Sequence, residues 1–449
     1  MNTAAPDVSA SVKAAQRAAV FAPVDKLLKK PLRSRLIYAG KARPLLSAGR
    51  HSMFKPLLGR RVIDVTQVLA GPYCTYQLAL LGAEVIKIEF PDGGDWTRGG
   101  GKDAELSAAG LALPFVTQNS AKKSVAIDLK NPAGLEALKA LIASTDVLVE
   151  NFKPGTADKL GIGYDDLKDA HPTLVYASLS AYGQDGPLGH RPAYDHIIQG
   201  MAGIMYTTGT PETVPNKVGS PYVDYATGLM GAFAVVTAVM ERDRTGQGQR
   251  VDVAMLDTAM LLMASLAVAT TASGTAPAPT GNEAFSGAPS SGTYATGDGL
   301  LMLAANTERQ FKLLCDAIGR ADLLNDARFA TPAARHDHID ALRAEFAAVF
   351  ATRGAAEWEE ILDRAGVPSV RVRRMDEVLA EPQLSARGLL QPVALNGVAR
   401  KVAVPSLGFK ANGQTVAPDA PPPLLGADTE VVLGALGLDL QALRAAGAI

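Results

Sequence analysis

Two aspartates lie in segments whose composition suits chemistry by a carboxylate. Asp195 lies within Pro192–Gln199. Asp224 follows Ser220–Val223 and opens the nearly uncharged stretch Tyr225–Met240. An aspartate at the start of a helix most often serves as its N-cap. The same position is partly desolvated and close to backbone N–H groups, so a carboxylate nucleophile can also be held ionised and aimed there. The residues alone leave both interpretations of Asp224 open.

A glycine-rich segment, Gly93–Gly101, follows a predicted strand and is the first candidate for contact with phosphate. Its spacing matches neither GxxxxGK[ST] nor GxGxxG, so nucleotide hydrolysis and dinucleotide binding are only weakly supported. We interpret the segment as a loop in which Arg98 is the residue best suited to contact an anion.

Other catalytic motifs do not occur in the sequence. There is no GxSxG elbow for a serine nucleophile, and the six histidines include no HExxH pair. The two cysteines, Cys74 and Cys315, are far apart and show no CxxC spacing. We therefore expect no metal site, no disulfide framework and a reducing compartment.

Short β-branched runs alternate with helical segments from Arg61 onward. The strand-like runs are Val62–Val65, Val85–Ile88, Ser124–Leu129, Val147–Val149 and Leu174–Ser178. Gly71-Pro72 and Asn131-Pro132 are typical of helix starts, with proline at the first helical position. This rhythm predicts an α/β fold: a parallel sheet covered by helices on both faces, with ligands at the carboxyl ends of the strands.

The composition predicts two domains and a linker. Residues 61–258 form a large Rossmann-like domain, which 385–449 complete; 282–384 form a smaller α+β domain, and 259–281 link them. The most apolar stretch, Met255–Thr271, is interrupted by Asp257 and falls short of the ~18 clean apolar residues of a membrane span. We therefore expect a buried helix there and no association with a membrane.

The charge is split between an N-terminal extension and the body. Residues 1–61 hold 13 basic residues against Asp7 and Asp25, a net charge of +11, whereas the rest hold 31 basic and 43 acidic residues, a net of −12. A nucleic-acid-binding body is disfavoured, because it needs basic residues on the folded domain.

Two interpretations of the extension, residues 1–60, compete. In the first, the extension is a mitochondrial transit peptide. In the second, it folds over the body or a partner subunit. Prolines 23, 31 and 44 interrupt any long amphipathic helix and favour the second, with a cytoplasmic location.

A set of motifs beginning near Leu58 resembles the family III coenzyme A transferases, the CaiB/BaiF family. The motifs, in the order and spacing of that family, are Val68–Pro72, Leu81–Glu89, Gly94-Asp95 with Arg98, Val149–Phe152 with Pro154-Gly155, Tyr182–Pro187, Asp224–Gly228 and Thr245–Gln249. The resemblance implies an interlocked homodimer of ring-like subunits, each with a large Rossmann-like domain and a smaller one.

The resemblance also implies roles for individual residues. Asp224 attacks the thioester of an acyl-CoA to give a mixed anhydride, and the returning thiolate gives an aspartyl-CoA thioester that a carboxylic acid then attacks. Val68 and Leu69 lie beside the reacting thioester and offer N–H groups to the oxyanion. Residues implied to line the CoA channel are Ile127, Lys130, Asn151, Phe152 and Lys159. Phe90 stands where some members have arginine, so Arg98 is expected to neutralise phosphate. CoA enters as a substrate, and no permanently bound cofactor is implied.

The alternative function within this family is a 2-methylacyl-CoA racemase, which exchanges an α-proton with an aspartate and a histidine. In that branch the histidine precedes the aspartate by 30 residues, where this chain has Tyr194. Tyrosine, with an ordinary pKa of about 10, is too weak a base for the task, so CoA transfer is favoured. The Gly281-Asn282 loop resembles that of many dicarboxylate-using members, and this resemblance, together with the match at Pro421–Gly426, favours succinyl-CoA as donor and a dicarboxylate as acceptor.

Overall fold

The computed structural model describes residues 54–449, so all but the last residues of the N-terminal extension lie outside it. Both hypotheses for the extension concern residues outside the described part and stay predictions. Leu57 already belongs to the folded body: its side chain is buried, and its N–H donates to Leu81 O at 3.0 Å. The body therefore begins before residue 61.

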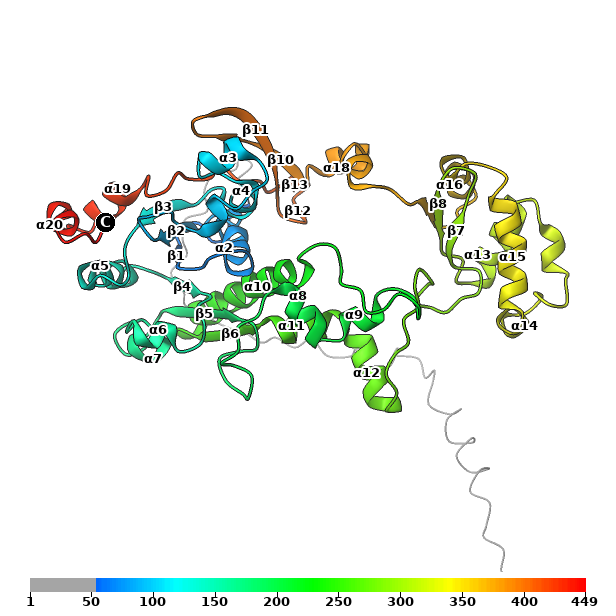
Figure 1. Ribbon diagram of the computed structural model, residues 1–449, viewed down its shortest axis with the longest axis horizontal. Helices are drawn as coiled ribbons and strands as arrows, with labels where there is room; N and C mark the ends of the chain where they lie inside the picture. The colour runs from blue at the N-terminus through cyan, green and yellow to red at the C-terminus, as the bar shows by residue number, and fades with distance from the viewer. Residues whose placement is uncertain (1–53) are drawn as a thin grey trace, which may run out of the picture. The chain divides into compact units, whose positions relative to one another are not determined.

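A parallel sheet of six strands, in the order β3-β2-β1-β4-β5-β6, organises the larger part of the body (Figure 1). The strands are β1 (Arg61–Asp64), β2 (Glu84–Glu89), β3 (Lys123–Ala126), β4 (Val147–Glu150), β5 (Val175–Ser180) and β6 (Arg250–Ala254). The predicted α/β class is confirmed. The strand order reverses between β1 and β4, and at such a switch point the loops leave on opposite sides and open a crevice for ligands.

Successive residues of each strand supply two separate cores, because side chains alternate between the faces of a sheet. On one face Ile63 and Ile86 pack with α5 (Pro132–Ile142) and with residues around α6 (Thr156–Lys159) and α7 (Tyr164–Leu167). On the other face Val62 and Val85 pack with α2 (Ala70–Leu80) and α10 (Tyr222–Thr245). Strands that are apolar on both faces suit a sheet buried between helices.

The long helix α10 is apolar and long enough to cross a membrane by length and composition alone. Val235 and Val239 are nevertheless buried in the core on the sheet face that α2 also covers. This packing is that of a core helix.

The prediction of one buried helix over Met255–Thr271 holds only for its first half, where Met255, Thr258 and Ala259 are buried. The segment forms α11 (Met255–Leu262) and α12 (Ala264–Ser273), which bend by 79° about Met263. No residue of α12 is buried within the described chain. In α12 the apolar composition therefore reflects an uncovered surface.

A further core lies between Tyr294 and Val367. It joins a three-stranded antiparallel sheet, β7 (Gly292–Ala295), β8 (Leu300–Leu303) and β9 (Ser369–Arg371), to four helices. These helices are α13 (Glu308–Ala317), α14 (Pro332–Asp337), α15 (Ile339–Phe350) and α16 (Ala355–Arg364). Helix α13 begins with a capping box between Thr307 and Gln310.

The chain then returns to the parallel sheet. After α17 (Met375–Leu379) and α18 (Pro382–Arg387), the hairpin of β10 (Leu390–Leu395) and β11 (Val398–Pro405) packs Val393 and Val404 against Leu106 and Val116. The latter two lie on α3 (Ala104–Ala108) and α4 (Leu113–Asn119). A short hairpin, β12 (Lys410–Ala411) and β13 (Gln414–Thr415), precedes α19 (Thr429–Gly434) and α20 (Leu440–Ala445). Short helices α8 (Asp195–Met201) and α9 (Ile204–Thr207) lie between β5 and α10 in the chain.

A network of buried charges lies beside the segment that follows β1. Lys122 Nζ contacts Asp64 at 2.9 Å, and Lys87 Nζ contacts Asp95 at 3.1 Å, all four side chains being fully buried. Burial alone raises the pKa of Asp64, but Lys122 and Lys87, with the hydroxyls of Thr66 and Thr75, hold it at about 2. The ions are therefore fixed by one another rather than by water.

Arg98 and Glu89 form the third ion pair of this region. Arg98 Nε and Nη2 donate to the Glu89 carboxylate at 2.7 and 2.6 Å. Arg98 Nη1 donates to the carbonyls of Gly110 and Pro423, both at 3.1 Å. The guanidinium also lies 3.7 Å from the centre of the Phe115 ring. The side chain ties Gly93–Gly101 to the sheet and to the returning C-terminal part of the chain.

We predict that Arg98→Met lowers the free energy of unfolding by about 3–5 kcal/mol, because Glu89 is left as a buried charge without a partner. Lys139→Met is the matched control, since it removes a cation from the exposed pair Lys139–Glu136 and is expected to change stability little. Urea unfolding followed by circular dichroism measures both. Coincident unfolding curves for Arg98→Met and the parent protein would show that the pair is not structural.

Candidate active site

Asp224 lies in the first turn of α10, but it is not the N-cap. Pro221 holds that position, and Asp195 supplies the capping contacts. Asp195 Oδ2 accepts hydrogen bonds from the N–H groups of Val223 at 2.7 Å and Asp224 at 3.2 Å. Within the described residues the Asp224 carboxylate itself accepts no hydrogen bond. The N-cap interpretation is therefore wrong, and the carboxylate is free for chemistry.

Asp195 is itself held from the other side. Gln199 Nε2 donates to Asp195 Oδ1 at 2.5 Å, and Gln199 Oε1 accepts from Val218 N at 2.8 Å. Asp195 and Gln199 are both buried and lie one turn apart on α8. They join α8 to the start of α10.

Glycine at position 228 brings Asp224 close to the segment after β1. Gly228 lies one turn after Asp224, and a Cβ there would stand 2.8 Å from Ala70 O and 3.0 Å from Tyr73 Cβ. Any side chain would push α10 away from the start of α2. Thr227 is fully buried and donates from Oγ1 to Val223 O at 2.7 Å. The Asp-x-x-Thr-Gly spacing thus places one carboxylate and one close helix contact on the same side of α10.

A cavity of about 160 Å³, here named the Asp224 cavity, opens in front of this carboxylate. Most of its surface comes from apolar and backbone groups at the ends of β4 and β5 and the start of α2. Its lining residues are Val68, Leu69, Ala70, Asn151, Leu179, Ser180, Ala181, Ala193, Tyr194, Asp224, Thr227 and Met255. It has room for a small reacting group and contains no histidine.

The pKa of Asp224 is raised to about 7, mainly by burial and in addition by the negative charge of Asp195. The carboxylate is therefore a stronger base and nucleophile than an exposed aspartate when ionised. Active sites often contain ionisable groups whose pKa is shifted toward 7 by burial and by a nearby charge.

Val68 has a strained backbone in the wall of this cavity. Its φ is 75°, in the left-handed region that a β-branched residue rarely adopts. Its N–H donates to Asp95 Oδ2 at 3.2 Å, and its carbonyl accepts from Gln118 Nε2 at 2.5 Å. The predicted oxyanion donor at Val68 is thus already engaged. Leu69 N–H has no acceptor among the described residues, and it precedes the positive end of α2.

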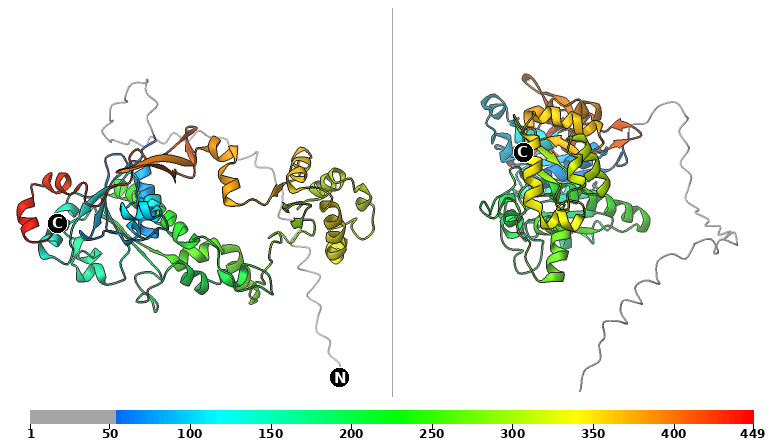
Figure 2. Two further views of the ribbon diagram at one scale, coloured as in Figure 1. Left: turned by 45° about the horizontal axis from the view of Figure 1, so that its top comes forward. Right: turned by 90° about the vertical axis from the view of Figure 1, so that its right-hand side faces the viewer.

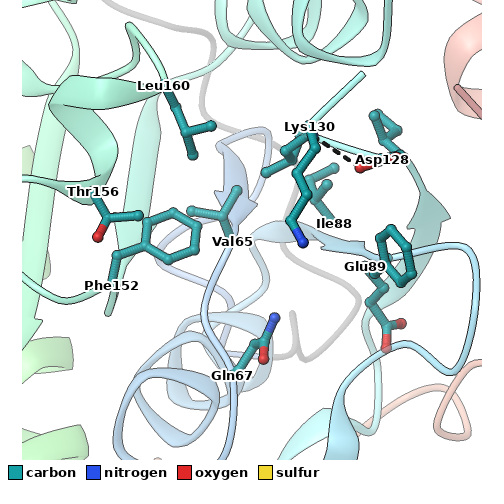
Figure 3. Close-up of a pocket in the computed structure, with 12 residues that line it drawn as sticks. Val65, Gln67, Ile88, Glu89, Asp128, Lys130, Phe152, Thr156 and Leu160 are labelled. Atoms are coloured by element: carbon teal, nitrogen blue, oxygen red, sulfur yellow. Dashed lines mark hydrogen bonds between the residues drawn. The ribbon is translucent and has the colours of Figure 1, made fainter. Parts of the chain in front are cut away.

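A larger cavity of about 360 Å³, the switch-point cavity, lies at the carboxyl ends of β1, β2, β3 and β4. Figure 3 shows Phe152, Lys130 and Gln67 around its space, together with Val65. The other lining residues are Ile88, Glu89, Phe90, Ile127, Asp128, Leu129, Thr156 and Leu160. Within residues 54–449, Lys130 is exposed and forms no ion pair, so its charge is available to a ligand.

The two cavities share the same pair of loops. Gln67 lines the switch-point cavity and Val68 the Asp224 cavity; likewise Phe152 lines the first and Asn151 the second. Asn151 joins the loops, because its Oδ1 accepts from Gln67 N at 2.9 Å and its Nδ2 donates to Gln67 O at 2.8 Å. The two cavities are therefore lined by adjacent residues of these loops.

The predicted site residues divide into three groups. Ile127, Lys130 and Phe152 meet at the switch-point cavity, and Val68, Leu69, Asn151 and Asp224 meet at the Asp224 cavity. Lys159 is exposed and lines neither, although Thr156 and Leu160 beside it do. For Arg98 the sequence prediction is wrong: the side chain is buried and paired with Glu89, and four of its five N–H groups donate to Glu89, Gly110 and Pro423, so its charge is not available to a phosphate.

Sequence reasoning missed Gln67, Thr156 and Ser180 as lining residues. Gln67 directly precedes the Val68–Pro72 motif, and this position in the sequence could have identified it as a lining residue. Ser180 ends β5, and the rule that ligands lie at the carboxyl ends of strands points to it.

The site combines a free carboxylate, a small cavity and a larger cavity with a cation and an aromatic ring. Clusters of side chains suited to hold a metal ion do not occur among the described residues. The arrangement suits nucleophilic attack by Asp224 on a carbonyl group delivered at the end of a long ligand.

Comparison with known proteins agrees with this geometry. Residues 57–429 match the model of CoA-transferase family III. The succinyl-CoA:glutarate CoA-transferase of Mus musculus is 33% identical over 379 residues, which cover 84% of this chain and 86% of that protein. The acetyl-CoA:oxalate CoA-transferase of Acetobacter aceti is 37% identical over 336 residues, covering 75% and 85%.

A solved structure of a CaiB/BaiF family protein from Brucella suis superposes with a TM-score of 0.75 at 33% identity. It covers 85% of this chain and 99% of that one. The family expected from the motifs is confirmed: the chain belongs to CoA-transferase family III and is a CoA-transferase.

Proposed function

We propose that this transferase moves CoA from an acyl-CoA donor to a carboxylic acid through covalent intermediates on Asp224. The observation that carries the proposal is the pair of adjoining cavities, one of which ends at a carboxylate without a hydrogen-bond donor in the described chain. The nucleotide of CoA occupies the switch-point cavity, and the pantetheine arm passes Gln67 and Asn151. The thioester then lies beside Asp224.

The reaction proceeds by four acyl transfers. An Asp224 carboxylate oxygen attacks the thioester carbonyl and the carbon–sulfur bond breaks, which gives an acyl-aspartyl anhydride and CoA thiolate. The thiolate attacks the aspartyl carbonyl, releases the donor acid and leaves an aspartyl-CoA thioester. The acceptor carboxylate attacks that thioester and expels thiolate again. The thiolate finally attacks the acceptor acyl carbonyl and frees Asp224.

The surrounding residues support each step. Leu69 N–H and the start of α2 face the oxyanion that forms at each attack. The small, mostly apolar Asp224 cavity limits the entry of water, which would hydrolyse the anhydride and the thioester. Lys130 attracts phosphate in the switch-point cavity, and Phe152 offers a ring against which the base or the arm packs.

For substrates, we propose succinyl-CoA as the donor and a dicarboxylic acid as the acceptor. The printed names of two similar transferases support the acceptor class, because glutarate and oxalate are both dicarboxylic acids. The mouse relative also names succinyl-CoA as its donor. A mass-spectrometric screen of acyl-CoA donors against mono- and dicarboxylic acids tests this choice.

Asp224→Asn is expected to lower kcat by at least about 10³-fold, because the amide is neither an ionisable nucleophile nor able to form the anhydride. Hydroxylamine added during turnover is expected to trap a hydroxamate at Asp224 in the parent protein only, as detected by peptide mass spectrometry. Asp243→Asn, the same change at the far end of α10, is the control and retains activity.

Full activity of Asp224→Asn would refute the mechanism. If the parent protein instead exchanges the α-proton of an acyl-CoA with deuterium oxide without any acceptor acid, the racemase alternative is correct.

The pH dependence of kcat/KM for acyl-CoA is expected to show an acid limb near pH 7, because burial and Asp195 raise the pKa of Asp224 to about 7 and only the ionised form attacks. Asp195→Asn removes a negative charge but keeps an oxygen that accepts from the N–H groups of Val223 and Asp224. The pKa of Asp224 then falls, and the acid limb shifts to lower pH. An unchanged or higher limb in this variant would contradict the assignment.

We also propose that the chain forms a homodimer. Leu229, Phe233 and Met240 line one face of α10 and are 51%, 66% and 66% exposed, although they are large and apolar. The uncovered helix α12 adds Val268. Sedimentation is expected to show a dimer, and Phe233→Glu is expected to raise its dissociation constant by at least about tenfold. A parent protein that sediments as a monomer at micromolar concentration would contradict the proposal.

A further inference from the structure

The last elements of the described chain lie along the outer edge of β3. Figure 1 and Figure 2 both show α19 and α20, drawn in red, next to the helices and strands at this edge of the sheet. Asp428 Oδ2 accepts from Ser124 N at 2.9 Å, and Asp428 N donates to Ser124 O at 2.9 Å. Thr429 Oγ1 accepts from Ala126 N at 2.9 Å. The segment thus satisfies backbone groups that an edge strand leaves open.

Helix α20 ends in a turn that directs two carbonyl groups back at the loop after β3. Ala448 N donates to Leu443 O and Gly447 N to Arg444 O, each at 2.9 Å, and Gly447 has a φ of 67°. This is a Schellman turn. Ala448 is fully buried, and Leu443 and Ile449 pack against the core on this face of the sheet. The turn is therefore held in place by its packing against this core.

The two carbonyls hold the loop Asp128–Asn131 at both ends. Ala448 O accepts from Asp128 N at 2.8 Å, and Ala446 O accepts from Asn131 Nδ2 at 2.6 Å. Inside the loop, Asp128 Oδ1 accepts from Lys130 N at 2.8 Å (Figure 3). The amide oxygen of Asn131 meanwhile caps α5 by accepting from Ala133 N at 2.9 Å.

This loop is the part of the switch-point cavity that carries its cation. Asp128, Leu129 and Lys130 all line the cavity. The side chain of Lys130 makes no ion pair within residues 54–449, so the loop backbone anchors it at the cavity without help from a salt bridge. The contacts that fix that backbone come from residues 446–449, beyond the stretch matched by the family model, which ends at residue 429.

We propose that residues 446–449 position Lys130 for acyl-CoA, so that this segment sets the affinity for the CoA substrate without taking part in acyl transfer. The inference rests on the proposed assignment of the switch-point cavity to CoA. Asn131 and the carbonyls of Ala446 and Ala448 are positioning groups, because they act through the loop and do not line the cavity. Lys130 is the group that touches the substrate.

The test compares two independent ways to break the support. Asn131→Ser keeps an oxygen that caps α5 but loses the amide that donates to Ala446 O. Truncation after Ala445 removes both carbonyl contacts. Arg444→Gln is the matched control, since it breaks only the exposed pair with Glu430 on the same pair of helices. Lys130→Gln and Phe152→Ala report on the cavity itself. The measurements are steady-state kinetics with acyl-CoA and acceptor varied separately.

Asn131→Ser is expected to raise the KM for acyl-CoA by about three- to tenfold, the effect of one net hydrogen bond, while kcat and the KM for the acceptor stay within about twofold. The truncation is expected to raise it at least as much, with faster hydrogen exchange confined to residues 127–131. Arg444→Gln is expected to match the parent protein.

The outcomes separate this inference from the function on which it rests. If Lys130→Gln and Phe152→Ala leave the KM for acyl-CoA unchanged, the cavity is not the CoA site and the proposed function fails there. If those two variants raise it but Asn131→Ser and the truncation do not, the positioning role alone is wrong. A lower apparent kcat with both KM values unchanged in Asn131→Ser would indicate a smaller fraction of folded enzyme, and it would also overturn the inference.

Discussion

Pairing between buried ions beside the loop after β1 is the interaction on which the site depends. The ions are Lys87, Arg98, Lys122, Asp64, Glu89 and Asp95. A buried charge without a partner is very unfavourable, so each ion restricts where its neighbour can lie. The carboxylate of Asp95 reaches the N–H of Val68 in this way and helps to hold it in a strained conformation. The network thereby fixes the cavity wall that faces Asp224.

A second constraint, close packing at glycine, brings the carboxylate of Asp224 to that wall. Helix α10 approaches the start of α2 at Gly228, where no side chain fits, and Asp195 caps the first turn that carries Asp224. This close packing also buries Asp224, and burial raises the pKa of its carboxyl to about 7. Packing and reactivity therefore have one physical cause, the exclusion of water from the junction between the two helices.

Cations near the site divide into two classes with different roles. Lys87, Lys122 and Arg98 are buried and paired, and they shape the protein. Lys130 is exposed and unpaired among the described residues, and it faces the larger cavity. A body with a net charge of −12 can attract an anionic substrate only through such local, uncompensated charge. Residue type alone does not separate these classes. The sequence therefore predicted contact with CoA for both Arg98 and Lys130, although Arg98 is buried and paired.

The sequence by itself determined the alternation of strands and helices, the parallel sheet and the family, because these follow from local periodicity and from motifs with fixed spacing. It also marked Ile127, Lys130 and Phe152, which lie at strand ends where ligands bind. Only the tertiary structure decided that Arg98 is an internal ion, that Val68 N–H is engaged and that α12 is uncovered. These properties depend on partners distant in the chain, such as Pro423 for Arg98, and on which surfaces meet. Local sequence does not encode either.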